Sequence, residues 1–458
     1  MRFHSFDDVQ DHLDALGLFH MDFGLDRMRN ALGLLTPPFV TVQIVGTNGK
    51  GSTSTFLSCV ARAHGLKVGL YTSPHFVTPR ERIRINGTML PADRWPVLAD
   101  RVMEAAPNLT YFEFLTALGL LAFAEAGVDL VVMEAGLGGH YDATTAMPVQ
   151  AVCFTPIGMD HEKTLGPTLT DIASDKSQAM RPGVPAFTAP QEAEALDCLL
   201  RTAQEKGAEL RETASLPFPQ SALGLAGPHQ RVNARLAIAV WDWLADQHHW
   251  PNMPETAAKG LASAHFPGRF QRIPACNGLP PLILDGAHNP HGLRAFETAV
   301  RDADIVSAST STPTGDPSLY PYIKEEWIKP GALISSTAAL RFDDDFIIHR
   351  ARTVTDNIKL YEAWEEEMKP NAYNTVPIPA VHVMDLIAEG KMKPEQVDDL
   401  GDILMGNIPL HRKEDEIIVY SIGGMPVEDV AWGTMVYRNA LKKGIGTKLK
   451  LWDTPQMV

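Results

Sequence analysis

The stretch Gly46-Thr47-Asn48-Gly49-Lys50-Gly51-Ser52-Thr53 follows a β-branched run at 42–45 and leads into a helical pattern at 53–64. A glycine-rich turn between a strand and a helix, with a lysine in it, is typical of polyphosphate cradles, and the following hydroxyl can ligate Mg²⁺. The spacing differs from the common G-x-x-x-x-G-K-[ST] pattern, since Gly51 precedes Ser52. We predict a phosphate-binding loop; the alternative is a glycine turn with a surface lysine.

Short apolar runs alternate with longer helical segments on both sides of this loop. We predict strands at 42–45, 67–71, 129–133, 151–154, 282–284, 304–307 and 332–335, helices at 53–64 and 114–126, and an acidic, mainly helical segment at 361–409. This alternation predicts an α/β fold with a mostly parallel sheet. Ligands of such folds bind at the carboxyl ends of the strands.

Composition limits the class of protein. A chain of 458 residues suits two or three domains. Its 40 Lys+Arg and 55 Asp+Glu give a net charge of −15, which argues against binding to nucleic acid or anionic membrane. The four cysteines have no paired spacing and indicate reduced thiols, and the most apolar stretch, 114–124, is too short to span a bilayer. We expect a cytoplasmic monomer.

Several polar residues follow predicted strands. Glu134 comes at the end of the 129–133 run, and Asp160-His161 follows 151–154. A carboxylate and an imidazole near a triphosphate could bind Mg²⁺ together with water and phosphate oxygens. Taken singly, a histidine such as His161 is more often a surface or helix-capping residue. From composition alone, Lys176, in a predicted helix at 169–180, is more often a solvated lysine.

Ten segments in order resemble the dihydrofolate synthase/folylpolyglutamate synthase family, a branch of the Mur-ligase-like ATP-dependent amide ligases. They are GLDRM (24–28), GTNGKGST (46–53), YTSPH (71–75), RERIRING (80–87), FEFLTA (112–117), EAGLGG and DATT (134–145), GMDHEKTLGPTLTDIA (158–173), PHQRVNA (228–234), PGRF (267–270) and DGAHNPHG (285–292). The resemblance covers about residues 1–295 and implies a Mur-ligase-like P-loop domain over 1–273, with the start of a second domain at 274–298.

The resemblance also implies roles for individual residues. Those implied to contact ATP are Gly46 to Thr53, with Lys50 on the phosphates, and Asn233, Arg269, Asp285 and His288. Those implied to ligate or approach Mg²⁺ are Ser52, Ser73, Glu134 and His161. Lys176 corresponds to a lysine that family members carry as a carbamate, and Lys50, Lys176 and His161 are the expected catalytic residues. Phe112 and Glu113 fall in the pterin region, and Arg82, within a local arginine cluster, suits an anionic substrate.

Three positions depart from the family pattern. His140 replaces the usual Arg after GLGG, Thr145 replaces the usual Asn after DAT, and the usual EKAG reads Asp175-Lys176-Ser177-Gln178. Gln178 adds bulk beside the implied carbamate. The implied reaction adds L-glutamate to dihydropteroate or a folate through an acyl phosphate.

From about residue 299 the chain instead resembles the C-terminal part of the ornithine cyclodeaminase/mu-crystallin family of NAD(P)-dependent enzymes. The matching segments are 303–319, 329–345, 353–357, 400–410 and 417–452. The strand–G-x-G-x-x-A–helix turn that opens that family's nicotinamide domain is missing from the sequence, so we do not expect NAD(P) binding. We predict a partial Rossmann-like segment over 299–458.

The chain therefore reads as a chimera with a junction between about 292 and 304. A natural fusion, a mis-assembled reading frame and a constructed chimera all fit the sequence. The leading hypothesis is the ATP-dependent ligase, with activity reduced or lost through the replaced second domain. The alternatives are an NAD(P)-dependent cyclodeaminase-like enzyme and a scaffold that binds nucleotide without turnover.

Overall fold

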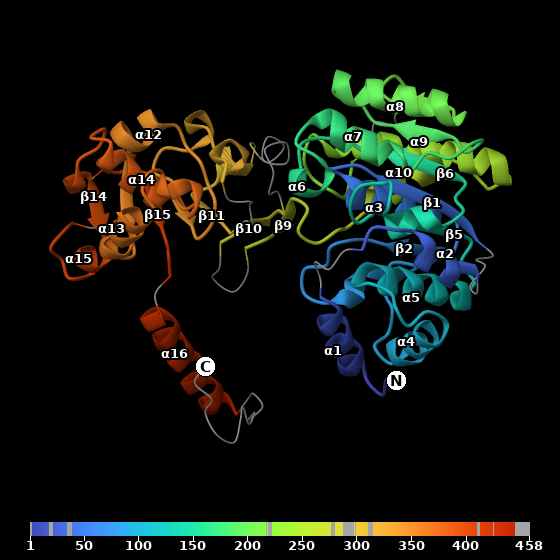
Figure 1. Cartoon of the computed structure of the whole chain (residues 1–458), viewed down its shortest axis with the longest axis horizontal. Coiled ribbons are helices and arrows are strands. Elements are labelled where there is room, and N and C mark those ends of the chain that lie inside the picture. Colours follow the sequence, from blue (N-terminus) through green and yellow to red (C-terminus); the bar gives the residue numbers. More distant parts are fainter. Residues whose placement is uncertain are drawn as a thin grey trace. The chain divides into compact units, whose positions relative to one another are not determined.

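The computed structural model describes residues 2–17, 22–33, 39–216, 218, 222–275, 280–286, 297, 299–309, 315–409, 413–424 and 426–444. The chain divides into two compact units, residues 1–296 and 297–458, which follow one another along the colour bar of Figure 1. This division leaves 274–296 with the first unit. No helix in the described ranges is both long and apolar enough to cross a membrane.

The first unit is built around a sheet that, among its described residues, has eight strands in the order β4-β3-β2-β5-β1-β6-β7-β8. The strands β2 and β5 to β8 run parallel to β1, while β3 is antiparallel to its two neighbours, β2 and β4. The bounds are β1 Val40–Val45, β2 Val68–Tyr71, β3 Ile83–Ile85, β4 Thr88–Met89, β5 Leu130–Glu134, β6 Ala151–Phe154, β7 Ala186–Thr188 and β8 Leu210–Glu212. A short hairpin of β9 (Gln271–Ile273) and β10 (Leu282–Leu284) follows.

Helices cover both faces of this sheet (Figure 1). Their bounds are α1 Phe6–Leu16, α2 Asp26–Gly33, α3 Lys50–Ala63, α4 Arg94–Ala105, α5 Tyr111–Ala126, α6 Glu162–Leu165, α7 Leu169–Ser177, α8 Ala193–Lys206, α9 Gln230–His248 and α10 Pro254–Ala262, with 3₁₀ turns η1 Pro79–Arg82 and η2 Ala143–Ala146.

The two faces of β5 serve two separate cores, because successive strand residues point to opposite sides. Leu130 and Val132 pack with side chains of α3, α9 and α10. Val131 and Met133 pack with those of α1, α4 and α5. We call these the α3 face and the α5 face. The sheet therefore separates two layers of helices, each with its own hydrophobic core.

The second unit contains, in its described part, a five-stranded parallel sheet in the order β11-β12-β15-β13-β14. Its strands are β11 Ile305–Ala308, β12 Leu333–Ser336, β13 Ala351–Thr355, β14 Val397–Asp399 and β15 Ile417–Ser421. Its helices are α12 Asp344–His349, α13 Ile358–Glu367, α14 Pro379–Ala388, α15 Leu400–Leu404 and α16 Pro426–Lys443, with 3₁₀ turns η3 Pro317–Leu319, η4 Glu325–Trp327, η5 Ala372–Asn374 and η6 Pro394–Gln396.

A buried ion pair ties two strands of this second sheet together. Arg352 of β13 donates from Nε to Oδ2 of Asp398 in β14 at 2.8 Å, and both side chains are almost fully buried. Arg352 Nη2 also donates to the carbonyl of Pro409 at 3.1 Å. A buried charge needs such partners, since the removal of one leaves the other desolvated and unpaired.

The predicted α/β class with a mostly parallel sheet is confirmed, and each predicted strand is present within one or two residues of its expected ends. Three details were wrong. The helix predicted at 53–64 begins at Lys50, the helix predicted at 169–180 ends at Ser177, and the segment at 361–409 contains the strand β14 as well as helices. Three cysteines, Cys59, Cys153 and Cys198, are free and buried. Cys276 lies outside the described residues.

Candidate active site

The predicted phosphate loop connects β1 to α3, which starts at Lys50. Gly49 has a left-handed backbone, φ 88°, and a Cβ there would lie 2.2 Å from Oδ1 of Asn233. This position therefore requires glycine on both conformational and steric grounds. The loop is anchored to the segment after β6: the amides of Thr47 and Asn48 donate to the carbonyl of Pro156 at 3.1 and 3.2 Å.

Lys50 is turned back onto its own loop. Its ammonium donates to the carbonyls of Gly46 and Thr47 at 3.1 and 3.0 Å. Burial lowers the pKa of Lys50, and the carboxylates of Glu134 and Asp160 oppose that shift. The ammonium of this half-buried lysine is thus held by neutral carbonyl oxygens, which it can exchange for phosphate oxygens.

Helix α9 supports the first turn of α3 through a residue that the sequence analysis did not single out. Gln230 donates from Nε2 to Oγ of Ser52 at 3.2 Å and accepts at Oε1 from Nδ2 of Asn233 at 3.0 Å. All three side chains are buried. Thr53 is also buried, and its hydroxyl has no hydrogen-bond partner among the described residues. Gln230 lies in the PHQRVNA segment (228–234), so that segment could have identified it from the sequence.

Glu134 is the last residue of β5 and lies beside the loop. Its Oε2 accepts the amide of Ser73 at 2.9 Å, and a Cβ on Gly51 would be 3.3 Å from the same oxygen. Burial raises the pKa of Glu134, while Lys50, Arg269 and Arg82 lower it. Arg82 is itself buried, and its Nε lies 2.9 Å from Nδ1 of His75.

The segment Gly136–Asp142 after Glu134 forms a tightly bonded loop, here called the 136–142 loop. Oδ2 of Asp142 accepts the amides of Gly136 and Leu137 at 2.8 and 3.0 Å. Oδ1 of Asp175, in α7, accepts the amide of Gly139 at 2.8 Å. Two buried or half-buried carboxylates therefore fix the base and the tip of the loop.

A glutamine in the central strand fixes the turn that follows this loop. Gln43 of β1 is fully buried and donates from Nε2 to the hydroxyls of Thr144 and Thr145 at 2.9 and 2.7 Å. The hydroxyl of Thr145 donates onward to the carbonyl of Gly139 at 2.7 Å. Thr145, a departure from the family pattern, thus links the strand to the loop tip.

Lys176 is buried, with 3% of its surface exposed, so the solvated alternative was wrong. Burial, then the charge of Lys50, lowers its pKa to about 7, against the opposing influence of Asp160, Asp175 and Asp142. Asp160, which the sequence analysis noted together with His161, acts on both lysines. His161, by contrast, is half-exposed and occupies the N-cap position of α6, where its side chain makes no capping hydrogen bond.

Two of the implied substrate residues lie at the start of α5. Phe112 packs edge-on to Tyr71, with ring centroids 5.8 Å apart. Glu113 accepts from Nε of Arg27 at 3.1 Å and from the amide of Thr110 at 2.9 Å, which caps the helix. The carboxylate of Glu113 is therefore engaged by the protein itself.

Arg269 and Asp285, implied to contact the nucleotide from beyond α10, flank the β9–β10 hairpin, before β9 and after β10. Oδ2 of Asp285 accepts the amide of Phe270 at 2.7 Å. The guanidinium of Arg269 lies 5.9 Å from the ring centroid of Phe266, and its charge reaches Lys50 and Glu134. His288 lies outside the described residues.

A magnesium site must be judged from the donors present. Within the described ranges, no three His, Cys, Asp or Glu side chains gather closely enough to hold a metal. Mg²⁺ in phosphate-transfer sites typically takes one or two protein oxygens and completes its shell with phosphate and water. Glu134 and Ser52, both buried beside the loop, fit that arrangement.

Comparison with known proteins gives two different relationships along the chain. The dihydrofolate synthase/folylpolyglutamate synthase of Bacillus subtilis is 32% identical over 333 residues, covering 65% of this chain and 77% of that protein. The chain belongs to the dihydrofolate synthase/folylpolyglutamate synthase family. A folylpolyglutamate synthase of Arabidopsis thaliana is 37% identical over 295 residues, covering 57% of this chain. The chain spans about half the length of the Arabidopsis relatives.

Residues 293–444 match the model of the ornithine cyclodeaminase/mu-crystallin family. The chain thus joins a folate ligase family segment to a segment similar to a different family, and the predicted chimera is confirmed. Solved structures of family members share the fold: E. coli FolC with DHPP and ADP has a TM-score of 0.61 at 23% identity, covering 95% of this chain and 99% of that one. The apo form of L. casei FPGS has a TM-score of 0.59 at 24% identity, covering 94% and 100%.

Proposed function

We propose that this chain is an ATP- and Mg²⁺-dependent ligase that joins L-glutamate to dihydropteroate or to a folate. The observation that supports it most is the meeting of three groups at one sheet edge: the half-buried Lys50 on the phosphate loop, and the buried side chains of Glu134 at the end of β5 and Lys176 on α7. Relatives named for dihydrofolate and folylpolyglutamate synthesis add to this support.

The proposed reaction has two steps. A carboxylate oxygen of the acceptor attacks the γ-phosphorus of ATP, the bond to the β-phosphate oxygen breaks, and ADP and an acyl phosphate result. The amine of L-glutamate then attacks the acyl carbon, and phosphate leaves as the amide forms and the amine loses a proton. Phosphoryl transfer depends mainly on positioning and charge neutralisation.

The residues serve that positioning in distinct ways. The amides of the 46–53 loop and the Lys50 ammonium bind the phosphates, and Gln230 holds Ser52 and Asn233 in place. Ser52 and Glu134 would hold Mg²⁺, with Ser73 and His161 as further proposed contacts. When bound, Mg²⁺ neutralises phosphate charge and orients the γ-phosphate for attack.

Lys176 is proposed to act as a carbamate. With a pKa of about 7, its amine is substantially neutral at physiological pH and nucleophilic. The amine nitrogen would attack the carbon of CO₂, and a proton would leave as the N–C bond forms. The product is an anion, which suits a position beside Lys50.

The chimera adds no nicotinamide chemistry to this proposal. The strand–G-x-G-x-x-A–helix turn of the second family is missing from the sequence. We further propose that the chain works as a monomer in the cytoplasm, in keeping with its net charge of −15 and its free, buried thiols.

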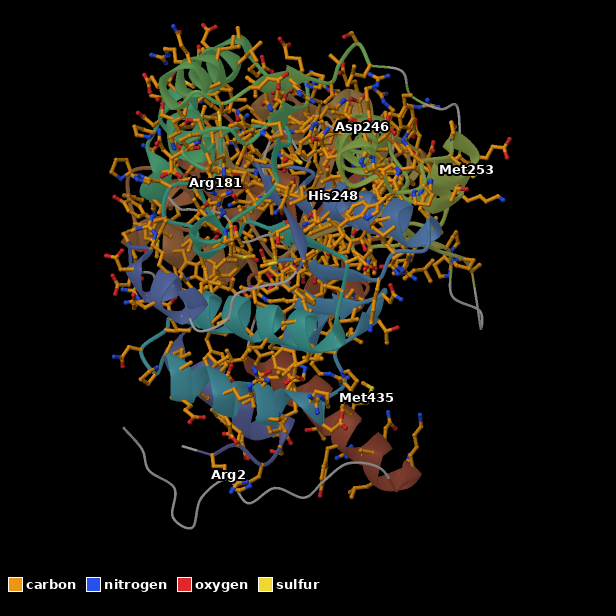
Figure 2. The ribbon with its side chains drawn as sticks, turned by 90° about the vertical axis from the view of Figure 1, so that its right-hand side faces the viewer. Arg2, Arg181, Asp246, His248, Met253 and Met435 are labelled. Atoms are coloured by element: carbon orange, nitrogen blue, oxygen red, sulfur yellow. The ribbon has the colours of Figure 1, made fainter. Side chains whose placement is uncertain are left out.

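Phosphate release by the purified chain tests the function. With MgATP and dihydropteroate or folate, we expect release that depends on L-glutamate and is lost in Lys50→Ala. Met253→Ala, which truncates an exposed side chain far along the chain from the loop (Figure 2), is the matched control. Glutamate-independent release, or wild-type ATP affinity in Lys50→Ala, would refute the proposal.

A further inference from the structure

Arg181 is a half-buried arginine that follows α7 and has no carboxylate partner in the part of the chain that the structure describes (Figure 2). Its Nη2 donates to the carbonyl of Thr145 at 2.9 Å and to Oε1 of Gln43 at 3.4 Å. Its Nη1 is buried and has no hydrogen-bond partner among the described residues. Burial lowers the pKa of Arg181 to about 10. Because neutral oxygens stabilise a desolvated cation less than a carboxylate does, these bonds indicate an orienting role.

The hydrogen bonds around Gln43 have a fixed direction. The hydroxyl protons of Thr144 and Thr145 are donated to acceptors in the 136–142 loop, at 2.5 and 2.7 Å. Since a hydroxyl has one proton, both oxygens can only accept from Nε2 of Gln43, at 2.9 and 2.7 Å. A turned amide would place Oε1 against two oxygens with no proton left to donate. Arg181 is the described donor to Oε1, so it fixes which way the amide faces.

This series of bonds ends at the tip of the 136–142 loop. The carbonyl of Gly139 accepts from the hydroxyl of Thr145, and its amide donates to Oδ1 of Asp175 at 2.8 Å. A Cβ on Gly139 would lie 2.4 Å from the carbonyl oxygen and 2.8 Å from Cα of Lys176, so the tip rests on the Lys176 backbone. Arg181 is thus connected, through the turn that contains Thr145, to the segment that covers Lys176.

A neighbouring cation has a different set of partners. Lys206, on α8, donates to the carbonyls of Gln178 and Met180 at 2.7 and 3.1 Å. A cation bound to the last carbonyls of a helix stabilises the helix end. Arg181 instead donates away from α7, to a side chain of β1 and to η2. Its described bonds therefore order the loop rather than the end of the helix.

From these contacts we propose that Arg181 is a positioning residue for Lys176, because it holds the tip of the 136–142 loop on the Lys176 backbone. The inference rests on the proposed function, in which Lys176 forms a carbamate. Without Arg181, Oε1 of Gln43 would be buried without this donor, and the amide could turn and release the Thr145 hydroxyl. A buried network keeps one arrangement only while every member is paired. The Lys176 amine would then lose the fixed position in which it takes up CO₂.

Carbamate formation in the full chain tests this role separately from turnover. Under ¹³CO₂, ¹³C NMR would measure the carbamate, and Lys176→Met would identify its signal. We expect Arg181→Met to raise the CO₂ concentration for half occupancy about 5- to 10-fold, and to lower kcat for glutamate-dependent phosphate release about 10-fold with an unchanged KM for ATP. Arg181→Lys, which retains a donor for the Thr145 carbonyl, should fall between wild type and Arg181→Met.

A second variant shows whether Arg181 acts through Gln43. We expect Gln43→Met to weaken carbamate formation, and Arg181→Met/Gln43→Met to lose no more than the weaker of the two single variants, because both changes break one network. Arg235→Met is the matched control. Arg235 is also half-buried, donates to the carbonyl of Ala214 at 2.9 Å and has a buried Nε without a described partner. Carbamate formation should stay at the wild-type level in this control.

The contrary results are distinct. Wild-type carbamate occupancy in Arg181→Met would overturn the inference, even with a lower melting temperature, and would leave the ligase proposal standing. Additive losses in the double variant, or an equal loss in Arg235→Met, would also overturn it. If Arg181→Met does not fold, wild-type occupancy in Gln43→Met overturns the inference. A wild-type chain that forms no carbamate overturns it too, whereas one that forms the carbamate without glutamate-dependent phosphate release contradicts only the proposed function.

Discussion

Replacing Lys176 with methionine should stabilise the first unit while it abolishes turnover. The amine is buried with two other charged groups of the site nearby, and burial lowers its pKa from 10.5 to about 7. The unfolded chain then binds the extra proton more readily than the folded chain. Methionine has a similar length and carries no charge, so it removes this penalty.

The size of the effect depends on pH in a defined way. A change of one pKa unit corresponds to about 1.36 kcal/mol, so the shift costs up to roughly 4 kcal/mol at pH 7 and roughly 2 kcal/mol at pH 9. The penalty is complete below pH 7 and disappears as the pH rises towards 10.5. Since water and the nearby acids relax around the charge, we expect a measured gain of about 1–3 kcal/mol at pH 7.

Urea unfolding in CO₂-free buffer, at pH 7 and pH 9, measures this gain. Hydrogen exchange read by mass spectrometry separates the transition of the first unit from that of the second. Lys259→Met, at an exposed position of α10, is the control and should change stability by less than about 0.5 kcal/mol at either pH. A loss of stability in Lys176→Met at pH 7, or a gain that does not shrink at pH 9, would refute the reasoning.

Three further outcomes follow from the described contacts. Lys50→Met should lower kcat about 100-fold or more in the phosphate-release assay with an unchanged melting temperature, and a mere rise in KM for ATP would contradict its proposed role. Gly49→Ala should destabilise the first unit by about 1–3 kcal/mol in urea, because its Cβ would lie 2.2 Å from Asn233 Oδ1; wild-type stability would show that the loop relaxes freely. Arg352→Met should destabilise the second unit by about 3–5 kcal/mol in thermal unfolding, because it leaves the Asp398 carboxylate buried and unpaired. The double variant Arg352→Met/Asp398→Leu should recover most of that loss. No recovery would mean that packing, rather than the unpaired carboxylate, determines the loss of stability.

The sheet of the first unit could be predicted well because its signals are local. Residues 42–45 and 130–133 are fully buried and have no helical period, so only a strand in a covered sheet suits them. The ends of the helices and strands were harder to predict from the sequence. The start of α3 depends on Gly49 adopting a left-handed backbone, which is a property of the folded loop rather than of the residue pattern.

Some residues of the candidate site could likewise be predicted from the sequence, and others could not. Lys50 and Glu134 could be selected from their places after strands, since chain order alone brings strand ends to one edge. Lys176 could not, because its burial depends on contacts with the 136–142 loop, far away in sequence. Gln230 acts through a partner on another element, and no spacing rule connects it to Ser52 across 178 residues.

Gln43, a residue inside the sheet, helps to order the loop beside the site. It is the polar side chain on β1 whose amide orders Thr144 and Thr145, and through Thr145 the tip of the 136–142 loop. An apolar replacement would suit the surrounding core, but it would leave the buried hydroxyl of Thr144 and the half-buried hydroxyl of Thr145 without this donor. Selection for a more stable core would therefore act against selection for an ordered loop, and the two properties would have to be optimised together at this one position.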